Sequence, residues 1–115
     1  MKLKIYHNTR CSKSRATLQI LKDKNIDHEV ITYLDNPPSA DELSNILTML
    51  GFNPQDLMRK NQAEYKSSGL DNENLGREEQ IELMIANPIV IERPIVVFKG
   101  KAIIGRPPEN ILDII

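Results

Sequence analysis

The single cysteine of this 115-residue chain, Cys11, lies in a segment whose residue types suit a reactive thiol. Residues 3–6 are mostly apolar and predict a short strand, whereas the apolar spacing of residues 12–24 predicts a helix. Cys11 would then stand at a helix N-terminus, where unpaired backbone N–H groups and the helix dipole favour a negative charge. Three neighbouring cations add to this effect, and no acid interrupts the segment: Arg10, Lys13 and Arg15. We therefore expect a thiolate nucleophile rather than the small buried hydrophobe that a free cysteine usually is.

The overall composition excludes several classes of function. Sixteen acidic residues nearly balance fifteen basic ones, so the net charge of −1 gives no sign of a nucleic-acid partner. One cysteine cannot form an internal disulfide, and two scattered histidines, His7 and His28, are too few for a metal site. No apolar run approaches the roughly 20 residues that span a bilayer, and residues 1–5 enter a strand without the apolar core of a signal peptide. We expect a cytoplasmic monomer with neither nucleic-acid nor membrane partners.

The first 35 residues predict a strand, a helix and a second strand. The second strand is expected at residues 28–33, where β-branched residues precede the turn signal Asp35-Asn36-Pro37-Pro38. Such a βαβ unit implies parallel strands with a right-handed crossover. A helical block over about residues 36–90 follows, in which Ser39 and Glu42 have the spacing of a capping box and Gly51 would end the first helix. Its expected helices are 39–50, 54–58 and 77–86, with an irregular polar segment at 67–76.

The C-terminal third returns to strands. Residues 95–98 are an apolar run typical of a strand covered on both faces, and residues 99–100 are a tight-turn signal before a return strand at 102–104. Pro107-Pro108 would open a final helix that runs to residue 115. The order βαβ, helical block, ββα predicts one α/β domain over residues 1–115, with a thioredoxin/glutaredoxin-like mixed sheet and a helical insertion. A cis proline faces the active cysteine of that fold, so the resemblance predicts a cis Arg93–Pro94 bond.

Four separated blocks, which together span nearly the whole chain, resemble the glutaredoxin-coupled arsenate reductase (ArsC) family. They are His7-Asn8-x-x-Cys11-x-x-Ser14-Arg15, Met58-Arg59, Glu92-Arg93-Pro94-Ile95-Val96-Val97 and Gly105-Arg106-Pro107-Pro108-Glu109.

The resemblance implies roles for the residues that match. Cys11 corresponds to the nucleophile that forms a thiol–arsenate adduct, His7 to a histidine linked to thiol activation, and Ser14 to a serine close to the sulfur. Three arginines match those that hold the oxyanion: Arg59, Arg93 and Arg106. Arginine suits this task because its planar, permanently charged guanidinium offers paired donors to tetrahedral oxygens.

The cysteine loop departs from the family pattern in two ways. Thr9 replaces a common proline, and Arg10 and Lys13 make the loop more basic than in some members. The single thiol also requires an external thiol to resolve any adduct on Cys11. The resemblance implies that glutathione, as co-substrate, and then glutaredoxin supply this thiol. No bound cofactor is expected.

Structural roles compete with the catalytic ones. Arg59 could be an ordinary helix charge, Arg93 could pair with Glu92, and Arg106 could contact Glu109. His7 could be a hydrogen-bonded residue of the strand end, and Ser14 could cap backbone groups.

Two other functions remain open at the level of sequence. A monothiol oxidoreductase acting on glutathione mixed disulfides would keep the fold without arsenate. An Spx-like RNA polymerase-binding regulator also resembles the Arg-Pro-Ile block, although Ser14 stands where such regulators have their second cysteine.

Overall fold

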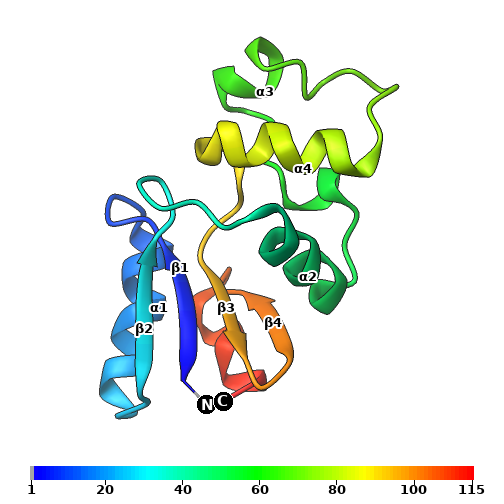
Figure 1. The fold of residues 1–115 in the computed structure, drawn as a ribbon. Coiled ribbons are helices and arrows are strands. Elements are labelled where there is room, and N and C mark those ends of the chain that lie inside the picture. Colours follow the sequence, from blue (N-terminus) through cyan, green and yellow to red (C-terminus); the bar gives the residue numbers. More distant parts are fainter. Residues whose placement is uncertain (1) are drawn as a thin grey trace. The chain divides into compact units, whose positions relative to one another are not determined.

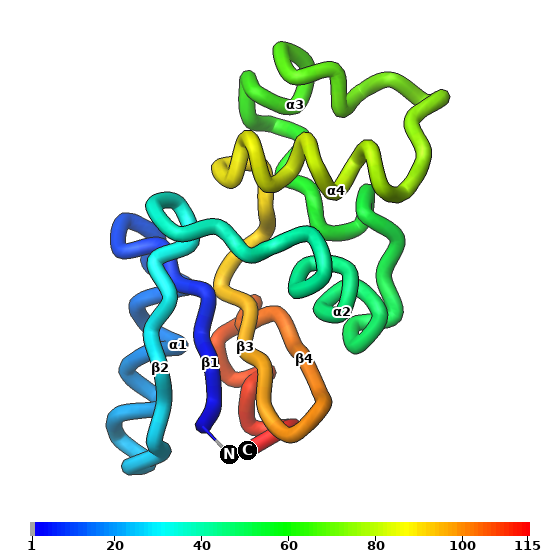
Figure 2. Tube along the Cα trace, in the orientation of Figure 1, coloured from blue at the N-terminus to red at the C-terminus, as the bar shows by residue number. Residues whose placement is uncertain are grey.

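The computed structural model describes residues 2–115, so Met1 of the expected N-terminal segment lies outside the described residues. The chain divides into two compact units. The first unit combines the N-terminal residues up to Asn36 with Arg93–Ile115, and the second unit is Pro37–Glu92. Figure 2 lets the reader follow the chain from one unit into the other and back.

The first unit is built on a four-stranded mixed sheet in the order β2-β1-β3-β4 (Figure 1). Strand β1 (Leu3–His7) pairs in parallel with β2 (His28–Thr32) and antiparallel with β3 (Ile95–Phe98). Strand β4 (Lys101–Ile104) completes a hairpin with β3. Helix α1 (Ser12–Asp23) joins β1 to β2. The predicted βαβ and ββ parts are confirmed.

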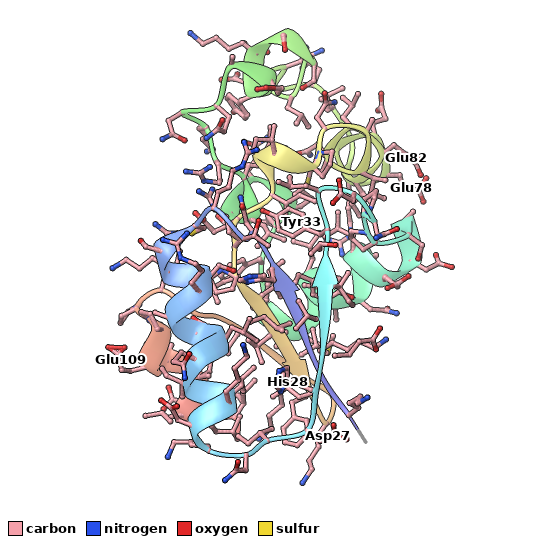
Figure 3. All side chains as sticks on the ribbon, turned by 90° about the vertical axis from the view of Figure 1, so that its left-hand side faces the viewer. Asp27, His28, Tyr33, Glu78, Glu82 and Glu109 are labelled. Carbon is pink, nitrogen blue, oxygen red and sulfur yellow. The ribbon has the colours of Figure 1, made fainter. Side chains whose placement is uncertain are left out.

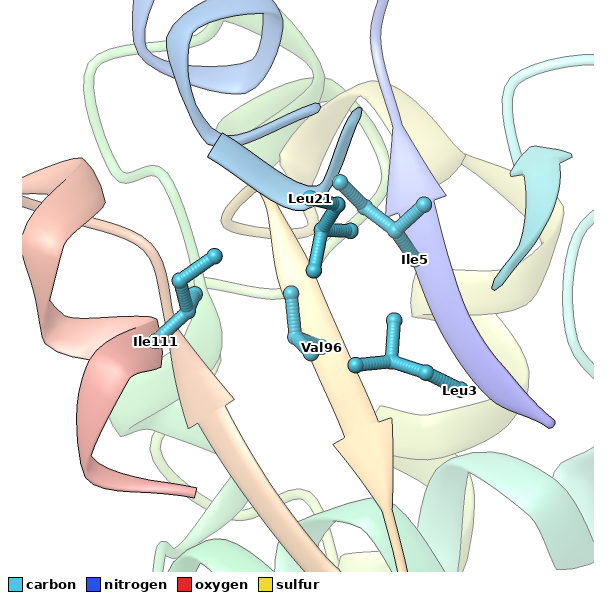
Figure 4. Close-up of a cluster of buried hydrophobic side chains, with 5 residues drawn as sticks. All are labelled: Leu3, Ile5, Leu21, Val96 and Ile111. Atoms are coloured by element: carbon cyan, nitrogen blue, oxygen red, sulfur yellow. The ribbon is translucent and has the colours of Figure 1, made fainter. Parts of the chain in front are cut away.

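Alternating apolar residues fix which face of the sheet is covered. Leu3 and Ile5 on β1 are fully buried together with Leu21 of α1, Val96 of β3 and Ile111 near the C-terminus (Figure 4). Because side chains two apart on a strand point to the same face, Leu3 and Ile5 direct this face towards α1. This cluster holds α1 against the sheet and thereby fixes the position of its first turn.

The β3–β4 turn shows how two residues determine a hairpin. Lys99 and Gly100 both have positive φ angles, of 51° and 77°. A two-residue loop with positive φ at both positions matches the right-handed twist of the flanking strands. This tight turn makes β4 return directly beside β3, so residues 93 and 106 come to the same end of the hairpin.

The second unit is helical. It contains α2 (Ala40–Leu50), α3 (Ala63–Ser67) and α4 (Arg77–Ala86), with short 3₁₀ turns η1 (Pro54–Leu57) and η2 (Pro88–Val90). The predicted capping box is confirmed, since the Glu42 N–H donates to Ser39 Oγ at 3.1 Å and the Ser39 N–H donates to Glu42 Oε1 at 3.4 Å. Gly51 ends α2 in the left-handed conformation.

Some predicted elements differ from the structure. The final segment is a 3₁₀ helix, η3 (Pro108–Asp113), and not a helix from Pro107 to residue 115. Pro107 lies before the first helical position, and the six residues that follow it keep the tighter hydrogen-bond pattern common in short helices. The segment at 54–58 is likewise a 3₁₀ turn, which ends at Leu57. Helix α3 was not predicted, because its five residues have no apolar repeat.

No helix in residues 2–115 is long and apolar enough to cross a membrane.

We predict that the Leu21→Ala variant lowers the free energy of unfolding by about 3–5 kcal/mol, because it leaves a cavity in the cluster that seats α1. The same truncation at Leu112, which is 45% exposed, is the matched control and should cost much less. Urea unfolding followed by circular dichroism measures both values. Similar losses for the two variants would contradict this account of the core.

Candidate active site

Cys11 is the N-cap residue of α1 and ends a tight loop that follows β1. Its backbone N–H donates to Asn8 O at 3.1 Å, and its carbonyl accepts the Arg15 N–H at 3.0 Å. The Asn8 side chain holds the same loop, since its Oδ1 accepts the Arg10 N–H at 2.9 Å. These hydrogen bonds fix the Cys11 backbone at the start of the helix, and the residue is only 7% exposed.

The surroundings lower the pKa of the Cys11 thiol. Burial acts in the opposite direction and raises the pKa, because it disfavours the charged form. Hydrogen bonds from the Ser14 N–H, the Arg93 side chain and the Lys13 N–H, together with the positive charge of Arg93, outweigh burial. The predicted contribution of the helix start is confirmed by the Ser14 and Lys13 N–H groups. The charge that lowers the thiol pKa is that of Arg93, and not that of Arg10, Lys13 or Arg15 as the sequence led us to expect.

Two predicted arginines meet at the sulfur. Arg106 Nη1 lies 3.8 Å from Cys11 Sγ and also donates to the Arg93 carbonyl at 3.3 Å. Arg93 precedes β3 and Arg106 follows β4, so the hairpin brings them together from positions 13 residues apart. The first unit thus joins one thiol and two guanidinium groups into one cluster.

Arg59 belongs to the second unit. Its backbone N–H donates to the Val90 carbonyl, and its Nε lies 3.7 Å from the Glu92 carboxylate. The Glu92 partner considered for Arg93 in the sequence is thus an ion-pair partner of Arg59. A role for Arg59 in holding an oxyanion stays a prediction.

His7 and Ser14 form a buried pair behind the cysteine loop. His7 Nδ1 lies 2.6 Å from Ser14 Oγ, which also accepts the Asn8 N–H at 3.1 Å. Burial lowers the pKa of His7, and the charges of Arg15 and Lys22 lower it further. A neutral imidazole can accept a hydrogen bond at Nδ1 from the Ser14 hydroxyl. The His7 Nδ1, the Ser14 hydroxyl and the Asn8 N–H then each have a hydrogen-bond partner. His7 therefore contacts Ser14, and the Ser14 backbone N–H reaches the sulfur.

Sequence reasoning missed a contact that joins α1 to the segment carrying Arg106. Thr17 is fully buried, and its Oγ1 donates to the Lys13 carbonyl at 2.9 Å and lies 3.4 Å from the Gly105 carbonyl. The Gly105 N–H donates to the Pro94 carbonyl at 2.9 Å. A Cβ at Gly105 would lie 2.5 Å from Thr17 Oγ1 and 2.8 Å from Pro94 Cγ. Only glycine allows this approach, and its place directly before Arg106 was the available signal.

The backbone at the two arginines contains two cis peptide bonds. The predicted cis Arg93–Pro94 bond is confirmed, and Arg106–Pro107 is also cis, which the sequence did not lead us to expect.

His28, for which no functional role was expected, lies at the start of β2 (Figure 3), with its Nδ1 2.7 Å from the Ile26 carbonyl. Within residues 2–115, no group of three or more His, Cys, Asp and Glu side chains could hold a metal ion.

We predict that Ser14→Ala destabilises the protein by about 1–3 kcal/mol, because it leaves the buried Asn8 N–H and His7 Nδ1 without the hydroxyl. It should also move the pH midpoint of iodoacetamide alkylation of Cys11 upwards, since the loop that directs the Ser14 N–H to the sulfur loosens. Ser12→Ala, at an exposed position of the same turn, is the control and should change neither quantity appreciably. Equal effects of the two variants would contradict the role of the His7–Ser14 pair.

We predict that Gly105→Ala costs about 1–3 kcal/mol of stability, because the added methyl group overpacks Thr17 and Pro94. The displacement should also carry Arg106 away from the sulfur and raise the thiol pKa, which alkylation at a series of pH values measures. Gly76→Ala is the control, since a Cβ there meets only Glu79 Oε1 at 3.5 Å. An unchanged alkylation profile in Gly105→Ala would show that the close approach does not position Arg106.

Comparison with known proteins identifies the family. The sequence model of the ArsC family matches residues 6–114. The uncharacterized protein YfgD of Escherichia coli (strain K12) is 48% identical over 114 residues, which cover 98% of this chain and 96% of that protein. An arsenate reductase of Neisseria meningitidis serogroup A is 46% identical over 110 residues, covering 95% of this chain and 94% of the relative. A solved structure of an arsenate reductase from Vibrio cholerae has a TM-score of 0.94 and 42% identity, and covers 100% of this chain and 98% of its own. By sequence and by fold, this chain belongs to the ArsC family.

Proposed function

We propose that this protein reduces arsenate to arsenite with Cys11 as the nucleophile. The observation that carries the proposal is a thiol whose pKa is lowered and whose sulfur lies beside Arg93 and Arg106. Relatives 46% and 42% identical are named arsenate reductase, which supports the same reaction class for this chain. The thiol and both arginines come from one chain, so the reaction is proposed for a monomer in the reducing cytoplasm, where thiols stay available.

The two arginines suit an oxyanion for the same reason that they suit a thiolate. Arsenate carries one to two negative charges near neutral pH, and its approach to an ionised sulfur is opposed by charge repulsion. Guanidinium groups and helix N–H donors would offset this repulsion, because they bind tetrahedral oxygens and keep their charge. In this proposal Arg59 supplies a third guanidinium, as the match to the family block implies.

The reaction begins at the arsenic atom. The Cys11 thiolate attacks arsenic(V) and forms an S–As bond, and one arsenate oxygen leaves as water after it takes up protons. The thiol of glutathione then replaces a second oxygen, again with release of water. Arg93 and Arg106 hold the remaining oxygens while the charge on them changes.

Reduction follows in a separate step. A glutaredoxin thiolate attacks the glutathione sulfur and forms a mixed disulfide, and the electron pair of the broken S–As bond remains on arsenic. Arsenic(V) becomes arsenic(III), and water then releases arsenite and restores the Cys11 thiol. His7 and Ser14 are proposed to act before these steps, by keeping the cysteine loop in the form that favours the thiolate.

The test is arsenate-dependent oxidation of NADPH, coupled through glutathione, glutaredoxin and glutathione reductase. We predict that Cys11→Ser abolishes turnover. Arg106→Gln should lower kcat/KM for arsenate about 10-fold or more, as expected when a charged hydrogen-bond donor worth about 1.5–3 kcal/mol is lost. Arg59→Gln should also raise KM for arsenate, which tests the third arginine separately.

Lys101→Gln, at an exposed position on β4, removes a charge without touching the cluster and is the control. Turnover of a glutathione mixed disulfide without any response to arsenate would instead assign the protein as a monothiol oxidoreductase. No thiol-dependent turnover at all, with capture of RNA polymerase, would favour the regulator.

A further inference from the structure

The near-zero net charge conceals two units of opposite sign. The first unit, which carries Cys11, contains eleven Lys and Arg residues against six Asp and Glu residues. The second unit contains four basic residues against ten acidic ones, among them Glu78 and Glu82 of α4, labelled in Figure 3. No acid occurs before Asp23 in the sequence. The unit with the thiol therefore favours anionic ligands by its composition.

Two cations in the cysteine loop have no part in the site described above. Arg10 and Lys13 flank Cys11, and both are exposed. Their backbone groups are used, since the Arg10 N–H donates to Asn8 Oδ1 and the Lys13 N–H bonds the sulfur. Among residues 2–115, neither side chain forms an ion pair. Arg93 and Arg106 contact the sulfur, whereas these two side chains are directed to solvent.

Because Cys11 is the only thiol of the sequence, a second thiol-bearing molecule must reach the adduct on Cys11. Cys11 has no partner cysteine in the chain, so an adduct on its sulfur must be resolved by a thiol from outside. We propose that Arg10 and Lys13 bind the carboxylates of a small anionic thiol and so direct its sulfur to the adduct held on Cys11. This inference rests on the proposed function, because it concerns the thiol that completes the same reaction.

Two exposed cations can attract an anionic thiol even though each ion pair is weak. A single exposed ion pair contributes little binding energy, but cations of one sign around a reactive atom raise the local concentration and the association rate of an anion. Screening by salt weakens such an effect, with a Debye length of about 10 Å at 0.1 M. The oxyanion occupies Arg93 and Arg106 at this stage, so the incoming carboxylates need separate cations.

A disulfide exchange tests the proposal without arsenate. Cys11 is first converted to a mixed disulfide with 5-thio-2-nitrobenzoate. The thiolate of the added thiol attacks the Cys11 sulfur, the new S–S bond forms as the old one breaks, and the nitrothiobenzoate leaves with the electron pair and is measured by its colour. There is no net oxidation or reduction. Failure of arsenate reduction therefore leaves this measurement intact.

The second-order rate constant is compared for glutathione, which carries a net negative charge, and for neutral 2-mercaptoethanol. For the Arg10→Gln/Lys13→Gln variant we expect the glutathione rate to fall about five- to tenfold, at the low end of electrostatic rate effects, and the 2-mercaptoethanol rate to stay within about twofold. Added salt should slow glutathione with the wild-type protein and have little effect with the variant.

The control variant is Lys24→Gln/Lys101→Gln, which removes the same charge. Lys24 follows the C-terminal end of α1, about 18 Å along the helix from its start, and Lys101 follows the β3–β4 turn at the same end of the first unit (Figure 1). Its rates should match the wild type. If the control slows glutathione equally, net charge alone acts and the proposal is wrong.

Three further outcomes would overturn the proposal. An equal fall for both thiols would mean that the cations only tune the reactivity of Cys11. Unchanged glutathione rates would mean that the carboxylates bind elsewhere. Slower exchange with reduced glutaredoxin alone would assign the two cations to a protein partner instead of a small thiol.

Discussion

Stabilisation of negative charge on one sulfur atom, that of Cys11, is the constraint around which the site in the first unit is organised. Burial of Cys11 opposes that charge, so the fold must supply donors that outweigh the loss of water. The start of α1 supplies the Lys13 and Ser14 N–H groups, and the β3–β4 hairpin returns Arg93 and Arg106 to the same point. The apolar cluster under α1 matters to chemistry because it holds the helix start where those donors converge.

The donors that stabilise the thiolate are the ones that an oxyanion would use. Arg106 is one such donor, since its Nη1 lies 3.8 Å from the Cys11 sulfur and the Arg93 carbonyl accepts a hydrogen bond from the same atom. In the proposed reaction, an oxyanion bound beside the sulfur would compete with it for these donors. The sulfur would then be less stabilised when it attacks, and a less stabilised thiolate is a better nucleophile. Shared donors would in this way link substrate binding to activation of the thiol.

The sequence predicts those elements of the fold that depend on a few neighbouring residues. The alternation on β1, the Lys99-Gly100 turn and the Ser39–Glu42 capping box each need only a few neighbouring residues, and all three are present. The meeting of Cys11 with Arg93 and Arg106 followed from family blocks rather than from any local pattern. The contact between Thr17 and Gly105 could not be predicted, because the two residues lie 88 positions apart in the sequence. The place of Gly105 before Arg106 marks the glycine but does not identify Thr17 as its neighbour. Helix α3 and the 3₁₀ form of η3 depend on similarly weak local preferences.

The absence of a second cysteine beside Cys11 also affects which products form when Cys11 is oxidised. A thiolate is the form that peroxides oxidise, and the first product is a sulfenic acid. In many proteins a neighbouring thiol condenses with that acid and forms a disulfide before irreversible oxidation follows. This chain has no such neighbour. A sulfenic acid on Cys11 therefore has no second cysteine of the sequence to condense with, and any reversal of this oxidation requires a thiol from solution.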